Sequence, residues 1–298
     1  MRPFGVRRLL PAILLLGALA LPAGSLSADK HCLWKVESDG GVAYLLGSIH
    51  FLTEDAYPLD EAIEEVFDRV DGLAFETDLD TLEAPATQMK MMKKGMYGEG
   101  ESLQTNVSAE TYEALRKRME SYGQSMLLFD RFRPWFLTAM LSALELQKQG
   151  FQPEHGIDMY FHARAKEAGK ETVGLEGVDF QIDLFAAIPE ERQEALLQYT
   201  LCELDLTSAY LDVIVDSWRK GDVATLDTTF VRMLVSEEAW TDLADRLVFD
   251  RNRDWVPKIE NLVRSEKEYL VVVGTLHLVG EGSVVDLLRR KGYVVEQM

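Results

Sequence analysis

The sequence predicts an α/β protein with a mainly parallel central sheet, flanking helices and large helical insertions. Apolar runs typical of buried strands alternate with amphipathic stretches typical of helices. A strand, a helix and a second strand follow one another between residues 42 and 75, which favours parallel pairing. Two longer stretches, near 79–170 and 178–266, carry mostly helical patterns. We therefore expect residues 29–298 to form a single domain.

The N-terminal residues have the pattern of a signal peptide rather than of a folded element. Three arginines precede the apolar run Leu9–Leu21, and small residues follow up to Ala28. This pattern predicts a signal peptide at 1–28 and a periplasmic or secreted protein, with an uncleaved N-terminal anchor as the alternative. No other apolar run approaches the ~20 residues of a membrane span, so we expect no stable membrane span after cleavage.

The net charge of the chain argues against two classes of partner. The formal net charge is −19, which argues against nucleic acid and anionic lipid, because both require a basic surface.

Two cysteines, Cys32 and Cys202, remain after the predicted cleavage. An oxidising compartment permits a disulfide between them, which requires Cα atoms within about 7 Å; two free thiols are the alternative.

The first half of the chain begins with a predicted β-hairpin. Leu33–Glu37 and Val42–Ile49 are strand-like runs, and the Asp-Gly-Gly sequence between them suits a tight turn. Pro58–Val70 is an amphipathic helix with acidic residues in its first turn. The strand Gly72–Phe75 follows and ends at Glu76.

The remainder is expected to be mostly helical, with three further strands. Thr81–Gln149 is helical in character. Its Lys-rich segment carries Met89, Met91, Met92 and Met96, a stripe usual for a core or a lid surface. The next expected elements are a helix at 156–169, a strand at 171–175, helices within 179–266, a strand at 269–276, a helix at 283–291 and a strand at 293–296.

One short motif occurs twice, near each end of the chain. Leu45–Leu52 contains Gly47-Ser-Ile-His50, and Val272–Val279 contains Gly274-Thr-Leu-His277. In both copies an apolar run precedes the glycine, so each histidine lies where a buried strand ends. Two histidines satisfied within the core are the alternative interpretation.

Four predicted strands end near a potential metal ligand or acid–base group: His50, Glu76, Glu176 and His277. Sites in open α/β sheets form at the carboxyl ends of parallel strands, so we expect these groups to meet. Two imidazoles and carboxylates suit a divalent metal such as Zn, Mn, Fe or Co, which would activate a water molecule. A metal-free site, with one histidine as base and a glutamate orienting it, is the alternative. The glutamates also suit helix caps or loop positions.

The remaining motifs say less about the function. Asp158 and His162 share a helix face at i, i+4 spacing, for which a structural pair is favoured over a pair of ligands. The chain has no Gly-x-Ser-x-Gly elbow, no His-Glu-x-x-His and no phosphate-binding glycine loop. These absences argue against lipase-like esterases, zincins and nucleotide-dependent enzymes.

The combination of motifs resembles the TraB/GumN family, which is related to the Tiki metalloproteases and, more distantly, to erythromycin esterase-like and ChaN-like folds. The similar segments are Leu33–Val36, Gly47–His50, Phe75–Glu76, Gly156–Asp158, Gly174–Glu176 with Gln181 and Phe185, Arg251–Asn252 with Trp255, and Gly274–His277 followed by Gly280–Gly282. They extend over essentially the whole chain after the signal peptide.

The resemblance implies a Tiki-style metal site. His50, Glu76 and His277 are the expected metal ligands; Glu76 is alternatively the general base, and Glu176 is a further acidic candidate. Arg251 or Arg253 is expected to clamp a substrate carboxylate or an oxyanion, with a surface salt bridge as the alternative.

The expected function is that of an exported, peptidase-like, metal-dependent hydrolase. The resemblance implies that its substrates are peptides or other small or extended molecules. A non-catalytic periplasmic protein that binds a metal or haem on the same fold is the alternative. Replacing His50 or His277 with alanine is expected to abolish metal retention and hydrolysis and to leave the fold largely intact.

Overall fold

The computed structural model describes residues 30–204, 207–235 and 241–298, so the predicted signal peptide lies outside the described residues. Strands in this part of the chain form one six-stranded sheet, in the order β4-β3-β5-β2-β1-β6. Their bounds are β1 Leu33–Ser38, β2 Gly41–Ser48, β3 Gly72–Thr77, β4 Glu171–Glu176, β5 Tyr269–Gly274 and β6 Val294–Gln297. The predicted α/β class is confirmed.

The sheet is parallel where the candidate site lies. β4, β3, β5 and β2 pair in parallel, whereas β1 pairs antiparallel with both β2 and β6. Every residue of β5 is buried, as expected for a central strand covered on both faces. The register of β2 and β5 sets Ser48 opposite Gly274, so the two Gly-x-x-His motifs emerge side by side.

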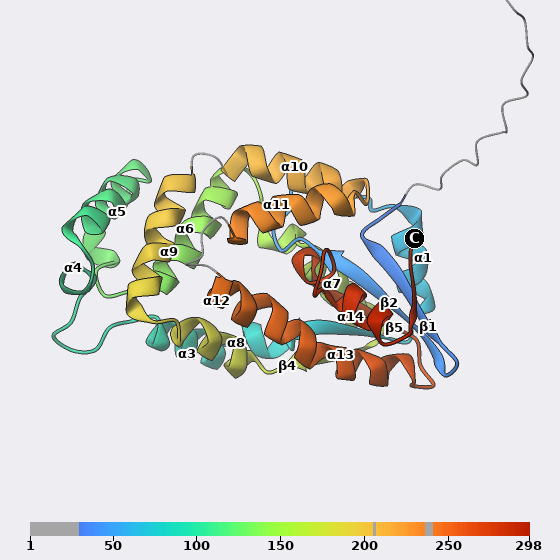
Figure 1. Cartoon of the computed structure of the whole chain (residues 1–298). Coiled ribbons are helices and arrows are strands. Elements are labelled where there is room, and N and C mark those ends of the chain that lie inside the picture. The colour runs from blue at the N-terminus through green and yellow to red at the C-terminus, as the bar shows by residue number, and fades with distance from the viewer. Residues whose placement is uncertain (1–29, 205–206, 236–240) are drawn as a thin grey trace, which may run out of the picture.

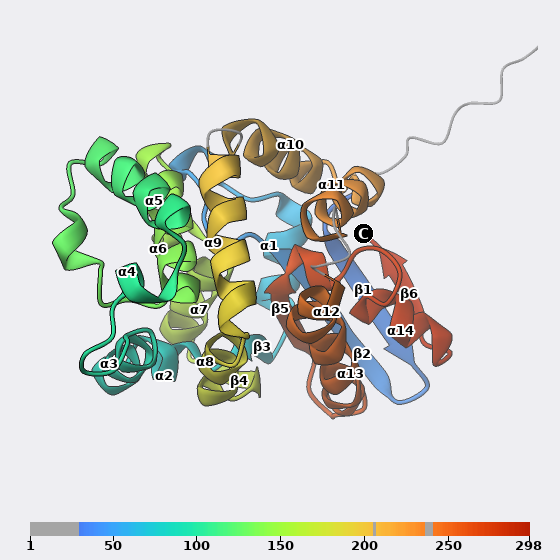
Figure 2. The same cartoon turned by 60° about the vertical axis from the view of Figure 1, so that its left-hand side comes forward.

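Helices surround this sheet and extend beyond one end of it (Figure 1). The helices before β4 are α1 Glu61–Arg69, α2 Leu79–Glu83, α3 Pro85–Lys94, α4 Leu103–Asn106, α5 Ala109–Ser121, α6 Pro134–Lys148 and α7 Ile157–Ala168. The helices after β4 are α8 Val178–Ala186, α9 Glu190–Glu203, α10 Thr207–Arg219, α11 Val223–Val235, α12 Thr241–Ala244, α13 Asp250–Val263 and α14 Val284–Arg290. In Figure 2, α3 to α6 and α9 lie together on the side away from β1 and β6.

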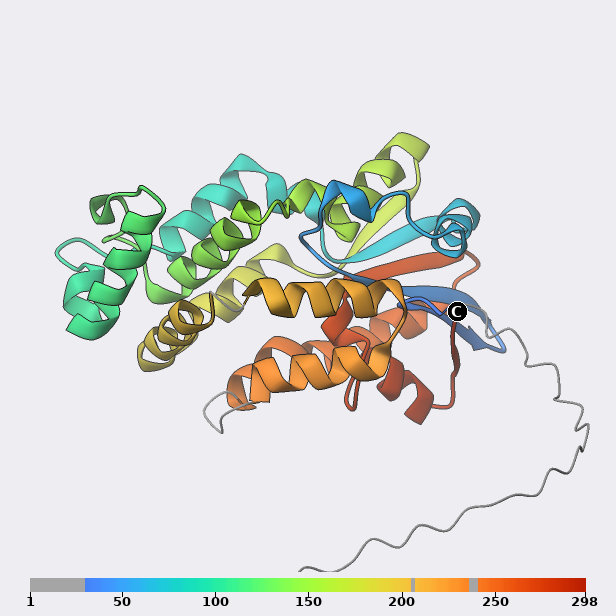
Figure 3. The same cartoon turned by 90° about the horizontal axis from the view of Figure 1, so that it is seen from above.

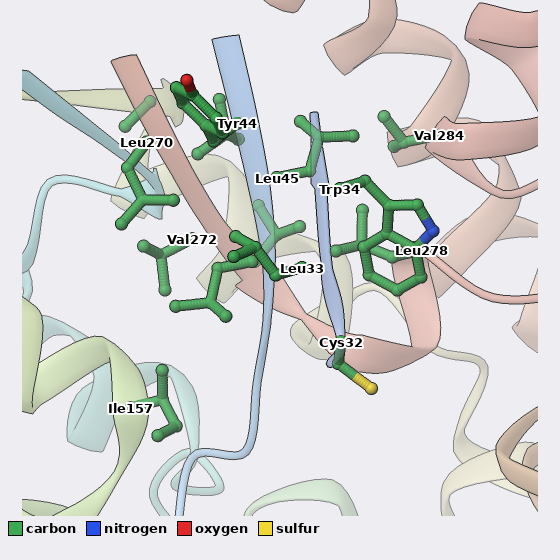
Figure 4. Packing of buried hydrophobic residues seen from close by; sticks show 14 of the residues in the cluster. Cys32, Leu33, Trp34, Tyr44, Leu45, Ile157, Leu270, Val272, Leu278 and Val284 are labelled. Carbon is green, nitrogen blue, oxygen red and sulfur yellow. The ribbon is translucent and has the colours of Figure 1, made fainter. Parts of the chain in front are cut away.

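The described residues form two hydrophobic cores. The larger core packs both sides of the sheet and includes the residues labelled in Figure 4, among them Leu33, Leu45 and Val272. The smaller core lies among the helices and includes Leu115, Leu137 and Leu197 from α5, α6 and α9. Each of these leucines is fully buried, which contributes about 1.5–3 kcal/mol per side chain. The helical part therefore has a core of its own.

Local sequence signals account for the helix ends. The side chain of Asp60 accepts a hydrogen bond from Ala62 N and caps α1. Gly169 ends α7 in the left-handed conformation, with φ of 67°, as the glycine after the expected 156–169 helix suggested. Figure 3 shows α10 and α11 alongside each other, and Trp218 of α10 donates from Nε1 to Gly47 O at 2.7 Å.

The last strand before the second motif is shorter than the sequence predicts. β5 ends at Gly274 rather than at residue 276, and Thr275–His277 form a 3₁₀ turn. Its neighbour β2 ends opposite Gly274, so no partner strand continues the hydrogen-bond ladder. Thr275 Oγ1 donates instead to Ser48 O at 2.9 Å.

Two further expectations have clear outcomes in the structure. The disulfide that an oxidising compartment permits is not formed, because Cys32 and Cys202 are both free; Cys32 is buried in the larger core and Cys202 is exposed on α9. The methionine-rich segment forms α3 and lies on the surface, where Met89 is 72% exposed. Among the described residues, no helix is both long and apolar enough to cross a membrane.

Candidate active site

The first motif histidine is held by an aspartate from α7. His50 lies two residues beyond β2, and its Nδ1 is 3.1 Å from Asp158 Oδ1. Ser48 Oγ donates to the same carboxylate oxygen at 2.9 Å. A Cβ on Gly156 would lie 2.3 Å from His50 O, so only glycine permits this approach of α7 to the loop. The Asp158 carboxylate raises the pKa of His50 to about 9, so the ring is protonated at neutral pH in this arrangement.

The second motif histidine is buried and neutral. His277 Nε2 is 3.2 Å from Arg251 Nη1, and its Nδ1 is 2.7 Å from Asn252 Oδ1. A guanidinium only donates, so Nε2 is the acceptor and Nδ1–H donates to Asn252. Asn252 Nδ2 donates in turn to Gly282 O at 3.0 Å, which agrees with this orientation of the amide. Burial lowers the pKa of His277 to about 4.

Glu76, near the end of β3, lies between the two histidines. Its Oε1 accepts a hydrogen bond from Gly274 N at 2.8 Å and is 3.9 Å from His50 Nε2. Its Oε2 accepts from Arg251 Nη2 and, at 3.4 Å, from Gln181 Nε2. Burial alone would raise the pKa of Glu76, but the nearby imidazoles and guanidinium and the Gly274 amide lower it to about 2. Glu76 is therefore a carboxylate at neutral pH.

Arg251, at the start of α13, has protein acceptors on all three of its nitrogens. Nε and Nη2 donate to the Glu176 carboxylate at 3.0 and 2.7 Å, and Nη1 donates to Leu247 O at 3.1 Å. The guanidinium also lies 4.6 Å from the centre of the Trp255 ring. Trp255 Nε1 donates to Glu176 Oε2 at 2.9 Å. Leu247 belongs to a single π-helical turn, Asp245–Phe249, a feature often found at functional sites.

These groups converge on one point beside Gly274. A Cβ placed there would lie 3.1 Å from Glu76 Oε1 and 3.5 Å from His277 Cδ2. The same position is 3.7 Å from His50 Nε2. The donor types, two imidazole nitrogens and a carboxylate, fit a divalent metal. However, no group of three His, Cys, Asp or Glu residues in the described part of the chain is arranged to hold one, and the Arg251 guanidinium contacts both Glu76 and His277.

Comparison with known proteins identifies the family. The chain matches the family model of TraB/PrgY/gumN over residues 32–297.

This chain belongs to the TraB/PrgY/gumN family.

The TraB/PrgY/gumN relatives include bacterial and animal proteins. The protein YbaP of Escherichia coli (strain K12) is 29% identical over 251 residues, which cover 83% of this chain and 87% of YbaP. Metalloprotease TIKI2 of Danio rerio is 22% identical over 303 residues, 85% of this chain and 58% of TIKI2. Metalloprotease TIKI1 of Homo sapiens is 21% identical over 318 residues, 89% of this chain and 61% of TIKI1. No solved structure matches significantly.

In this TraB/PrgY/gumN-family protein, five of the six residues named from the sequence lie in one cluster: His50, Glu76, Glu176, Arg251 and His277. Arg253 lies outside it. Its side chain is 58% exposed and pairs with Asp250 on the surface of α13. Arg251 and Arg253 are only two residues apart, so they point to different sides of the helix.

Two residues of the cluster were missed as site residues. Asp158 was paired with His162 by its i, i+4 spacing, but it contacts His50 instead. His162 is buried, 3.6 Å from Asp80 and edge-on to the Phe75 ring. Asn252 had no signal beyond its place next to Arg251. Asn252 accepts a hydrogen bond from Nδ1 of His277, and Asp158 faces Nδ1 of His50. A partner at this nitrogen commonly orients a metal-binding imidazole.

Replacing Asp158 with asparagine is expected to weaken metal binding by about 10- to 100-fold, because the amide supports the orientation and basicity of His50 less well. Isothermal titration with Zn²⁺ measures this change. The Asp80→Asn variant, next to His162 rather than His50, is the matched control and should bind metal like the unmodified protein. Equal affinities of the two variants would contradict the role of Asp158.

Proposed function

We propose that this protein is a metal-dependent hydrolase, with His50, Glu76 and His277 as the residues that hold the ion. The observation that carries the proposal is their convergence beside Gly274 at the carboxyl ends of β2, β3 and β5. The metalloprotease names of the TIKI relatives support hydrolysis as the reaction class. We also propose that the protein acts in the periplasm or outside the cell, on the basis of the signal-peptide pattern at 1–28.

The residues around these ligands have defined roles in this proposal. A bound divalent ion lowers the pKa of a coordinated water and so supplies a nucleophile near neutral pH. Asp158 and Asn252 fix the rings of His50 and His277, so that Nε2 of His50 faces Glu76 and Nε2 of His277 faces Arg251. Glu176 keeps the positive charge of Arg251 at the site, where it favours negative charge that develops on the substrate.

A peptide or another extended molecule is the proposed substrate. α8 contributes Gln181 to the site, where it contacts Glu76, and Phe185 lies one helical turn further along the same face. Phe185 is 40% exposed and stacks on Trp135, and Phe180, which precedes Gln181 in α8, is 46% exposed. These exposed aromatic side chains of α8 suit apolar side chains of an extended substrate.

The proposal is tested by metal removal. Protein purified without chelator is analysed for bound metal and incubated with a mixture of peptides, whose cleavage is followed by mass spectrometry. We expect cleavage that stops after dialysis against a chelator and returns on addition of Zn²⁺, Mn²⁺, Fe²⁺ or Co²⁺. Cleavage that persists in chelator would contradict the metal-dependent reaction, and bound metal without any cleavage would favour a binding protein instead.

A further inference from the structure

Arg251 contacts two of the proposed ligands of the metal. Its Nη1 is 3.2 Å from His277 Nε2, and its Nη2 donates to Glu76 Oε2. An imidazole nitrogen has one lone pair, so His277 Nε2 accepts the Arg251 hydrogen bond or binds an ion, but not both. The guanidinium and a divalent ion are therefore competing cations at this position.

The other side of the guanidinium is firmly held. Glu176 accepts from Nε and Nη2, Leu247 O accepts from Nη1, and Trp255 lies against its face. The side chains of Arg251 and Glu176 are 9% and 6% exposed, so water screens this pair little. Arg251 therefore remains beside the site whether or not it contacts Glu76 and His277.

We propose that Arg251 competes with the divalent ion for Glu76 and His277, and so sets the metal affinity of the site. This inference rests on the proposed metal site. Removing the guanidinium frees both ligands and removes a positive charge beside them. It also leaves the Glu176 carboxylate without the guanidinium that now joins it to Glu76 and His277. The freed carboxylate of Glu76 and the freed imidazole nitrogen of His277 are donor types that a divalent ion prefers.

The test compares Zn²⁺ affinity by isothermal titration of the protein and its Arg251→Met variant. We expect the variant to bind Zn²⁺ at least tenfold more tightly. Arg253→Met is the matched control, because it makes the same substitution two residues away on the exposed side of α13, and its affinity should not change. Co²⁺ absorption provides a second readout, since a change in the donor set alters the visible spectrum.

A double variant, Arg251→Met with Glu176→Gln, removes both members of the buried pair and serves if the single variant does not fold. It also should bind Zn²⁺ more tightly than the unmodified protein, because Glu76 and His277 are again free. If the unmodified protein binds Zn²⁺ and the folded Arg251 variants bind no more tightly, the competition is overturned and the proposed function stands. If none of them binds Zn²⁺, both are overturned.

Discussion

The His50→Ala variant is expected to lose metal retention and hydrolysis with little loss of stability. The His50 side chain is 56% exposed, so its removal creates no buried cavity, and loss of its partly exposed ion pair with Asp158 should lower the free energy of unfolding by about 1 kcal/mol. Hydrolysis should fall by at least about 100-fold, since loss of a ligand exceeds the effect of losing a residue that only orients one. Metal analysis, peptide cleavage and urea denaturation measure the three quantities.

The His277→Ala variant is the comparison. It should lose the same activity but also lose about 2–4 kcal/mol of stability, because His277 is buried against Trp255 and its removal leaves Asn252 Oδ1 without its hydrogen-bond donor. From the sequence alone, we expect an intact fold for both variants. The structure predicts different stabilities for them, because His277 is buried and His50 is exposed. Full cleavage activity in His50→Ala would contradict the proposed site.

Replacing Glu176 with alanine is expected to lower the free energy of unfolding more than the His277→Ala change does, by about 3–5 kcal/mol. Glu176 balances the charge of Arg251 within the protein, and both side chains are buried. Its removal leaves Arg251 with Glu76 as its only carboxylate partner recorded in the described structure. It also leaves the Trp255 Nε1–H without its acceptor.

Urea denaturation measures this effect, and Glu171→Ala is the matched control. Glu171 begins the same strand, β4, and pairs with Lys267 at the surface, where its side chain is 46% exposed. An exposed ion pair contributes about 0–1 kcal/mol, so this control should unfold almost like the unmodified protein. A similar loss in both variants would show that Glu176 has no special role in compensating a buried charge.

The sequence alone determined the fold class and where the site would be sought. Apolar runs, glycines and helical periodicity are local signals, and they correctly indicated strands that end near His50, Glu76 and Glu176. Parallel pairing then followed from the strand–helix–strand order, because parallel neighbours require a crossover connection. The family was also indicated by the motifs, and the family model confirms it.

Only the tertiary structure decided which groups contact one another. Asp158 lies 108 positions from His50, and its nearest helical neighbour His162 supplied a misleading local alternative. Arg251 and Glu76 lie 175 positions apart, so no spacing rule indicated that the guanidinium would lie at the proposed metal position. The tertiary structure likewise buries His277 and leaves His50 exposed, although their motifs are alike in sequence. Local periodicity specifies elements, whereas contacts and burial depend on how distant elements pack.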